Sequence, residues 1–221
     1  MIPLRSSEKI YTRTVATGAL IALNLVIFLY QSVLNPYALN EFVTQWGIVP
    51  DQFHMLTLFT SMFLHGGWMH LLGNMLFLWV FGRKIEDLIG SGRFLGFYLL
   101  GGLAAAVVQV MANPYSRVPT IGASGAIAGV MGAYLIKFPR SRIVTLVPVL
   151  VFVTTMDLPA YLLLLYWFGI QFLSGVGSLA QVDYTGGGIA WFAHIGGFLA
   201  GMVLIRLFPP KKRFRAWYDE E

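Results

Sequence analysis

Four polar side chains lie inside stretches of this sequence that are otherwise apolar, and their types suit nucleophilic catalysis. Ser124 stands in TIGASGAIAG, His194 in AWFAHIGG, and His70 and Asn74 in HGGWMHLLGN. A serine hydroxyl attacks a carbonyl only when a base takes its proton, and an imidazole with an ordinary pKa of about 6.5 suits that role at neutral pH. The attacked carbonyl becomes an oxyanion, which fixed hydrogen-bond donors stabilise. These residues therefore indicate acyl-transfer chemistry.

Each of the four residues has a place in that chemistry. We predict Ser124 as the nucleophile and His194 as its general base. The Asn74 amide and the His70 ring can donate hydrogen bonds to the oxyanion. The backbone N–H of Ser124 can do the same, because the first N–H groups of a helix have no partner within it and the helix dipole there favours negative charge.

The third member of a serine triad is missing, and a metal site is not expected. Asp157 is predicted near the cytoplasmic side and Asp183 in an outer loop, so a hydrolase here would use a serine–histidine pair. The chain has no cysteine. A catalytic zinc site usually has three protein ligands, and no H-E-x-x-H motif or buried carboxylate accompanies the histidines. We expect no metal and no cofactor.

The composition indicates that membrane-spanning helices position these residues. The chain is 57% hydrophobic and 11% charged over 221 residues, whereas a soluble domain carries roughly a quarter charged residues. Since a bilayer-spanning helix needs roughly 20 mostly apolar residues, we predict an all-α, multi-pass bundle of six transmembrane helices. The apolar runs are 15–34, 68–82, 94–112, 121–136, 160–180 and 189–208.

The distribution of positive charge predicts how the bundle is oriented. The net charge of +5 could suggest nucleic acid, but of the fifteen Lys and Arg residues all except Arg117 fall in the termini and in alternate loops. An excess of Lys and Arg marks cytoplasmic loops. We therefore expect both termini in the cytoplasm, an even number of spans, the lipid bilayer as partner and no nucleic-acid binding.

Two segments are harder to interpret. The region 143–180 is too long for one span, and two spans joined at TMDLP would make seven and place the basic tail outside, against the charge pattern. We therefore expect 160–180 to span and 143–156 to be an interfacial or re-entrant segment. The region 35–66 faces outside, and it could be partly sunk in the outer leaflet or form an ordinary interfacial helix.

The predicted orientation brings the four polar residues to one depth. At 1.5 Å per residue, they should lie roughly 5–13 Å below the outer surface. Glycines beside Ser124 and His194 would let the two helices approach closely. Each residue alone has a simpler explanation, because a serine in a glycine-rich span is usually a packing residue that bonds a carbonyl one turn back, and a histidine can be a proton relay or a satisfied bundle residue.

Together, the motifs resemble those of the rhomboid intramembrane serine proteases over roughly 14–208. HGGWMHLLGN is similar to the family's second-span motif, GASG to its nucleophile motif and AHIGG to the motif of its base. The resemblance implies a six-helix fold and cleavage of a peptide bond in or near the transmembrane helix of single-pass substrates, through an acyl-enzyme. It assigns Ser124 and His194 as the catalytic pair and His70 and Asn74 to the oxyanion site.

One departure from the family concerns the base. Some members carry a tyrosine four residues after the nucleophile, stacked on the histidine, and here that position is Ala128. The sequence therefore leaves open what orients the His194 ring.

The predicted organisation has three parts: a cytoplasmic segment 1–13, the protease domain 14–208 and a basic cytoplasmic tail 209–221. We expect a multi-pass protein of a prokaryotic plasma (inner) membrane that cuts near the outer face. The oligomeric state, the substrate and the helix that admits it stay open, although the span 160–180 is a candidate gate. Two other functions stay open: a non-catalytic protein that binds transmembrane helices, and a small transporter or channel.

Overall fold

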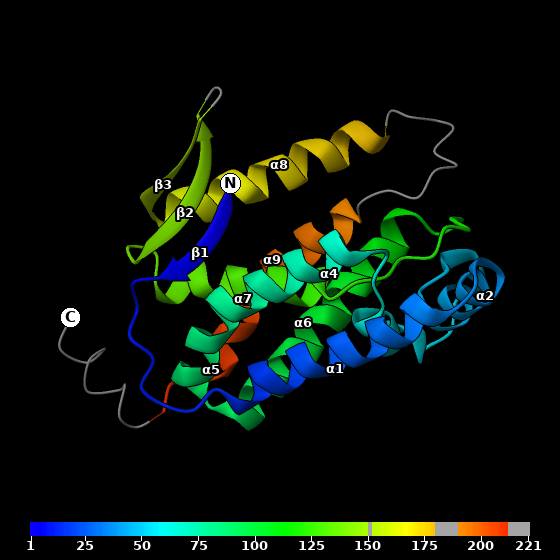
Figure 1. Ribbon diagram of the computed structural model, residues 1–221, viewed down its shortest axis with the longest axis horizontal. Helices are drawn as coiled ribbons and strands as arrows, with labels where there is room; N and C mark the ends of the chain where they lie inside the picture. Colours follow the sequence, from blue (N-terminus) through cyan, green and yellow to red (C-terminus); the bar gives the residue numbers. More distant parts are fainter. Residues whose placement is uncertain (150–151, 180–189, 212–221) are drawn as a thin grey trace.

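The computed structural model describes residues 1–149, 152–179 and 190–211 of the chain, and this part is mostly helical (Figure 1). Within it, three helices are long and apolar enough to cross a membrane: α1 (Val15–Val33), α6 (Ser91–Ala112) and α8 (Ala160–Leu179). Two shorter apolar helices are α7 (Ser124–Lys137) and α9 (Trp191–Leu204), the latter followed by the 3₁₀ turn η4 (Ile205–Leu207). The chain is therefore a membrane protein with a helical bundle.

Helices α6, α7 and α9 pack together at the centre of the bundle, with α1 on one side and α8 on the other (Figure 1). Their contacts use small residues. A Cβ at Gly102 of α6 would touch the Ala126 side chain of α7 at 3.2 Å, and one at Gly196 of α9 would meet the Val108 side chain of α6 at 2.6 Å. Burial of apolar surface does not drive helix association in lipid, so the helices associate through close packing. Small residues make that packing possible because they let the backbones approach closely.

The predicted span 68–82 is part of a longer helical segment with a local irregularity. Helix α4 (Trp68–Phe77) continues through the π-helical turn η3 (Leu78–Gly82) into α5 (Arg83–Ile89). Gly90, with φ of +94°, ends the segment and α6 begins directly afterwards. A π turn widens the helix by one residue, so the side chains on either side of it face different neighbours.

A small antiparallel sheet corrects the expectation of an all-α fold. Its strands are β1 (Ile2–Ser6), β2 (Arg142–Val149) and β3 (Phe152–Pro159), in the order β1-β2-β3. The segment predicted as interfacial or re-entrant, 143–156, thus forms most of a β-hairpin. The seven-span alternative is wrong for the same reason. An open sheet has unpaired edge groups, which hydrocarbon does not tolerate, so this hairpin is not a re-entrant element.

The region 35–66 contains four short helical pieces instead of one interfacial helix: α2 (Pro36–Trp46), η1 (Pro50–Gln52), α3 (Thr57–Thr60) and η2 (Ser61–Phe63). Helix α2 lies at the end of the bundle opposite to the sheet (Figure 1). The Asn35 side chain caps it by accepting from Ala38 N, and Pro36 occupies the first helical position, an arrangement typical of helix starts.

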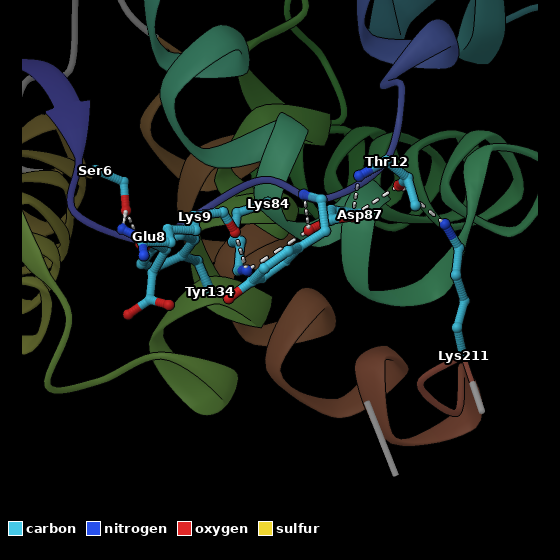
Figure 2. Close-up of polar contacts among 9 residues, drawn as sticks. Ser6, Glu8, Lys9, Thr12, Lys84, Asp87, Tyr134 and Lys211 are labelled. Atoms are coloured by element: carbon cyan, nitrogen blue, oxygen red, sulfur yellow. Dashed lines mark hydrogen bonds and ion pairs between the residues drawn. The ribbon is translucent and has the colours of Figure 1, made fainter. Parts of the chain in front are cut away.

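Buried charges tie the N-terminal segment to α5 (Figure 2). Asp87, which is fully buried, accepts hydrogen bonds from the backbone N–H groups of Tyr11 and Thr12 at 3.1 and 3.0 Å. Lys84 pairs with Asp87 at 3.6 Å and donates to the carbonyl of Lys9 at 2.7 Å. Buried charges need partners of this kind, so the network fixes the path of the chain into α1.

The neighbouring Glu86 has a similar structural role. Its carboxylate accepts from the N–H groups of Ala16 and Thr17, at 2.8 and 2.7 Å, and so caps the first turn of α1.

Two predicted segments lie largely outside the described residues, namely the loop with Asp183 and most of the basic tail 209–221.

Candidate active site

The chain turns sharply just before α7, which begins at Ser124. Gly122 has φ of +125°, a conformation that favours glycine, and its N–H donates to the Ser61 carbonyl at 2.9 Å. A Cβ at this position would also meet His70 Nε2 at 2.8 Å. Glycine is therefore needed here for the turn and for the approach of the His70 ring, and the turn places Ser124 as the first residue of the helix.

The Ser124 hydroxyl and the His194 imidazole form a hydrogen bond, with 2.7 Å between Oγ and Nε2. His194 is the fourth residue of α9 and is 8% exposed. Gln109 of α6 accepts from the N–H of Ala193 at 3.1 Å, which fixes the first turn of α9. Two residues that are 70 positions apart in the sequence are thus in direct contact.

Close packing of α7 against α9 makes that contact possible. A Cβ at Gly197 would lie 3.0 Å from the carbonyl carbon of Gly125, and even closer to its oxygen. Gly201 and Gly129 have the same relationship one turn further along. The glycines beside the two polar residues therefore serve helix approach, as small residues do in other membrane helix pairs.

His70 and Asn74 lie on α4 and face the turn at Gly122. The Gly66 N–H donates to His70 Nδ1 at 3.3 Å, so in the neutral ring Nε2 carries the proton and can act as a donor. The amide nitrogen of Asn74 lies within 3.7 Å of the Cβ position of Gly122 and is buried without a hydrogen-bond partner among the described residues. Both side chains thus present N–H groups beside the chain that leads to Ser124.

A fifth polar residue, Gln171 of α8, joins the site although the sequence analysis passed over it. Its Oε1 lies 2.6 Å from His194 Nδ1, and the side chain is buried. Trp167, one helical turn earlier, packs its ring against the imidazole with centroids 5.6 Å apart and planes 39° apart. A glutamine within the apolar span 160–180, four residues from an aromatic residue, is the signal that could have identified it.

His65, the first residue of the HGGWMHLLGN motif, lies in the loop before α4 and contacts the site indirectly. Its backbone N–H donates to Gln31 Oε1 of α1 at 3.0 Å, and its ring packs edge-on against His70 with centroids 5.1 Å apart. Burial, and then the nearby His70, lower the pKa of His65 to about 4. The His65 ring is therefore neutral at physiological pH, and its backbone anchors the motif to α1.

A small cavity lies next to Ser124. Its volume is about 20 Å³, and small side chains from α6, α7 and α9, including Ala105, Ala126 and Ala193, line it. A space of this size holds roughly one water molecule or a methyl group.

The fold and this arrangement define a class: multi-pass helical membrane proteins in which a serine at a helix start is hydrogen-bonded to a buried histidine of a neighbouring helix. Comparison with known families agrees, since a model of the Rhomboid domain matches residues 52–211. The chain belongs to the rhomboid family.

Curated relatives include a protease and an inactive protein. The chain is 30% identical to rhomboid protease GluP of Bacillus subtilis over 189 residues, 84% of this chain and 33% of that protein. It is 27% identical to the mitochondrial rhomboid protein 1 of Saccharomyces cerevisiae over 159 residues, which are 67% of this chain and 40% of that protein. It is 31% identical to inactive rhomboid protein 1 of Papio anubis over 162 residues, which are 73% of this chain and 16% of that protein.

Two facts follow from these relatives. The chain spans less than half the length of each of them. Because they include a mitochondrial protein, membership of the family does not decide which membrane holds this one.

Proposed function

We propose that this protein is an intramembrane serine protease that cleaves transmembrane-helix substrates through Ser124 and His194. The observation that carries the proposal is the 2.7 Å hydrogen bond between the Ser124 hydroxyl and His194 Nε2. A base within hydrogen-bond reach of the nucleophile is what activation of a serine requires. The relationship to rhomboid proteases such as GluP supports the same reaction class.

The proposed topology has six spans, formed by α1, the segment α4–η3–α5, α6, α7, α8 and α9. The N-terminal strand, the β-hairpin and the start of α8 lie at one end of the bundle, and α2 lies at the other (Figure 1). The charge distribution favours the cytoplasm for the first of these ends. Ser124 begins α7 and His194 lies in the first turn of α9, and with this orientation both residues would lie toward the outer face.

The reaction proceeds in two stages. His194 Nε2 takes the Ser124 proton as Oγ forms a bond to the substrate carbonyl carbon, and the His70 and Asn74 N–H groups, with the Ser124 backbone N–H, stabilise the oxyanion. The carbon–nitrogen bond then breaks as His194 gives the proton to the leaving amine. In the second stage His194 takes a proton from water, the resulting hydroxide displaces Ser124 Oγ from the acyl-enzyme, and the serine regains its proton.

The cavity beside Ser124 favours substrates with a small residue at the cleaved bond. Its volume of about 20 Å³ leaves room for little more than a methyl group. A helical substrate also hides its carbonyls in hydrogen bonds. Suitable single-pass membrane proteins therefore combine small and helix-breaking residues near the cut.

The direct test is a gel-based cleavage assay in detergent against a panel of single-span membrane proteins. We expect the wild type to cut at least one of them, and Ser124→Ala and His194→Ala each to abolish cutting while the protein stays folded. Ser32→Ala is the matched control, because the hydroxyl of Ser32 donates to the Leu29 carbonyl at an exposed position of α1. Cleavage by purified Ser124→Ala would overturn the proposal.

A second candidate function is the binding of transmembrane helices without catalysis. The similarity to inactive rhomboid protein 1 favours it. A pure binding protein needs neither the hydroxyl nor the imidazole, so a serine-reactive phosphonate separates the two functions. Labelling at Ser124 that is lost in His194→Ala supports the protease, whereas an unlabelled, folded protein supports the binder.

A further inference from the structure

Helix α8 supplies two side chains that together surround the free side of the His194 ring. Gln171 Oε1 lies 2.6 Å from His194 Nδ1, and the Trp167 ring packs on the imidazole with a centroid distance of 5.6 Å. The two residues are four positions apart, so they share one face of α8. The opposite ring nitrogen, Nε2, is the one that contacts Ser124.

We propose that Gln171 is the positioning residue of the general base, which it orients by accepting a hydrogen bond from His194 Nδ1–H while Trp167 packs on the ring. This inference rests on the proposed protease function. In neutral imidazole one nitrogen donates and the other accepts. When Nδ1 carries the proton, the lone pair of Nε2 faces the Ser124 hydroxyl, which is the arrangement that proton abstraction requires.

In the structure the amide oxygen of Gln171, and not its amide nitrogen, is the atom nearest to His194 Nδ1. A glutamine amide turned the other way would donate to Nδ1 and force the proton onto Nε2, so that the ring would donate to Ser124 and could not act as a base. Gln171 is 7% exposed and His194 is 8% exposed. Since little water reaches either group, the hydrogen bond between them decides the tautomer.

The arrangement also accounts for Ala128, the position where some rhomboid proteases carry a tyrosine stacked on the base. Ala128 of α7 is fully buried and has no ring to offer. Here the ring contact comes from Trp167 of α8 instead, and the carboxylate of an ordinary serine triad is replaced by the neutral Oε1 of Gln171. A neutral acceptor avoids placing an isolated charge inside the membrane, which is costly.

The first test compares Gln171→Leu with Gln171→Glu in the cleavage assay. Gln171→Leu removes the acceptor, and kcat should fall about 10- to 100-fold, the factor for losing one hydrogen bond to a charged group. KM should stay near the wild-type value, because Gln171 does not line the cavity beside Ser124. Gln171→Glu keeps an acceptor at the same place and should recover most of the loss.

A second measurement needs no substrate. The ¹⁵N chemical shifts of the ring, assigned to His194 by comparison with His194→Ala, report the tautomer of the resting protein. We expect Nδ1 to carry the proton in the wild type, and a mixture of tautomers in Gln171→Leu. Leu173→Met is the matched control on α8, because Leu173 is 72% exposed and faces away from the site.

The outcomes separate this inference from the function on which it rests. A folded wild type that neither cleaves nor reacts with a phosphonate overturns the protease function. An active wild type whose kcat is unchanged in Gln171→Leu overturns the role of Gln171 alone, and so does a wild-type ring protonated on Nε2. If Gln171→Leu does not fold, the tautomer of the wild type still decides the question.

Discussion

Gly197 of α9 lies directly against the backbone carbonyl of Gly125 in α7. A Cβ at Gly197 would be 3.0 Å from that carbonyl carbon and 3.2 Å from the Cβ of Ala105. Gly125 follows Ser124 in the sequence, and Gly197 is three residues after His194. The contact between Gly125 and Gly197 therefore sets the spacing between α7 and α9. It lies within one helical turn of the hydrogen bond between Ser124 and His194.

Gly197→Ala should weaken both stability and activity. Because the carbonyl of Gly125 belongs to the backbone and cannot rotate away, the added methyl group must push α9 from α7. Overpacking of this kind costs about 1–3 kcal/mol, and a shift of about 1 Å at a catalytic contact can cost about 100-fold in rate. We expect a lower melting temperature in detergent and a kcat reduced at least tenfold.

Gly96→Ala is the matched control for that experiment. Gly96 lies on α6, and a Cβ there would have no heavy atom within 4 Å. The melting temperature and kcat of Gly96→Ala should equal or exceed those of the wild type, since alanine favours the helix more than glycine does. Equal behaviour of the two variants would show that the contact between Gly125 and Gly197 does not control the site.

The residues of the candidate site were accessible to sequence analysis to different degrees. Ser124 and His194 could be selected because a bilayer excludes polar side chains that have no purpose. Gln171 could be noticed by the same rule, but its contact with His194 could not be predicted, since that contact depends on the rotation of α8 about its axis. That rotation is set by packing contacts, such as that of Gly175 with Ile195 and Trp191, where an added Cβ would lie within 3.2 and 3.3 Å.

The fold shows the same division. Apolar runs of about 20 residues predict helices through a local property, namely the length needed to cross a bilayer, and most of the predicted runs became helices. The sheet depends on pairing between distant segments, since Ile2 of β1 lies opposite Leu146 of β2. An apolar run with Pro148 gives no local sign of that partner. The number of spans and the boundaries 1–13, 14–208 and 209–221 stay predictions.

Asn74→Ala should lower kcat about 100- to 1,000-fold with little change in KM, because loss of one oxyanion donor removes stabilisation that only the transition state receives. The Asn74 amide nitrogen is buried and lacks a hydrogen-bond partner among the described residues. An unpaired buried donor is costly, and the oxyanion would satisfy it. Kinetics with a cleaved single-span substrate measure the effect. Asn40→Ala, on the exposed surface of α2, is the control, and a wild-type kcat in Asn74→Ala would contradict the assignment.

Asp87→Asn should destabilise the protein by about 1–3 kcal/mol, since the new amide would point a donor at groups that already donate. Asp87 accepts from Thr12 Oγ1 at 2.7 Å as well as from two backbone N–H groups, as Figure 2 shows. Chemical unfolding in detergent gives the change in free energy. Hydrogen exchange should show lost protection at Tyr11 and Thr12. Asp157→Asn, at an exposed position of β3, should be neutral, and equal loss in both variants would refute a specific role of Asp87.

The stability of the protein should fall as the pH is lowered from about 6.5 toward 4, partly through His65. The folded protein keeps this ring neutral, because burial and His70 lower the pKa of His65 to about 4, whereas the unfolded chain takes up a proton below about 6.5. The contribution of His65 to stability is thus fully present above its pKa in the unfolded chain. It is lost as the pH falls toward its pKa in the folded protein. His65→Leu removes the titrating ring, and it should reduce the loss of melting temperature between pH 7 and pH 5. Identical pH profiles of the variant and the wild type would show that His65 does not titrate on unfolding.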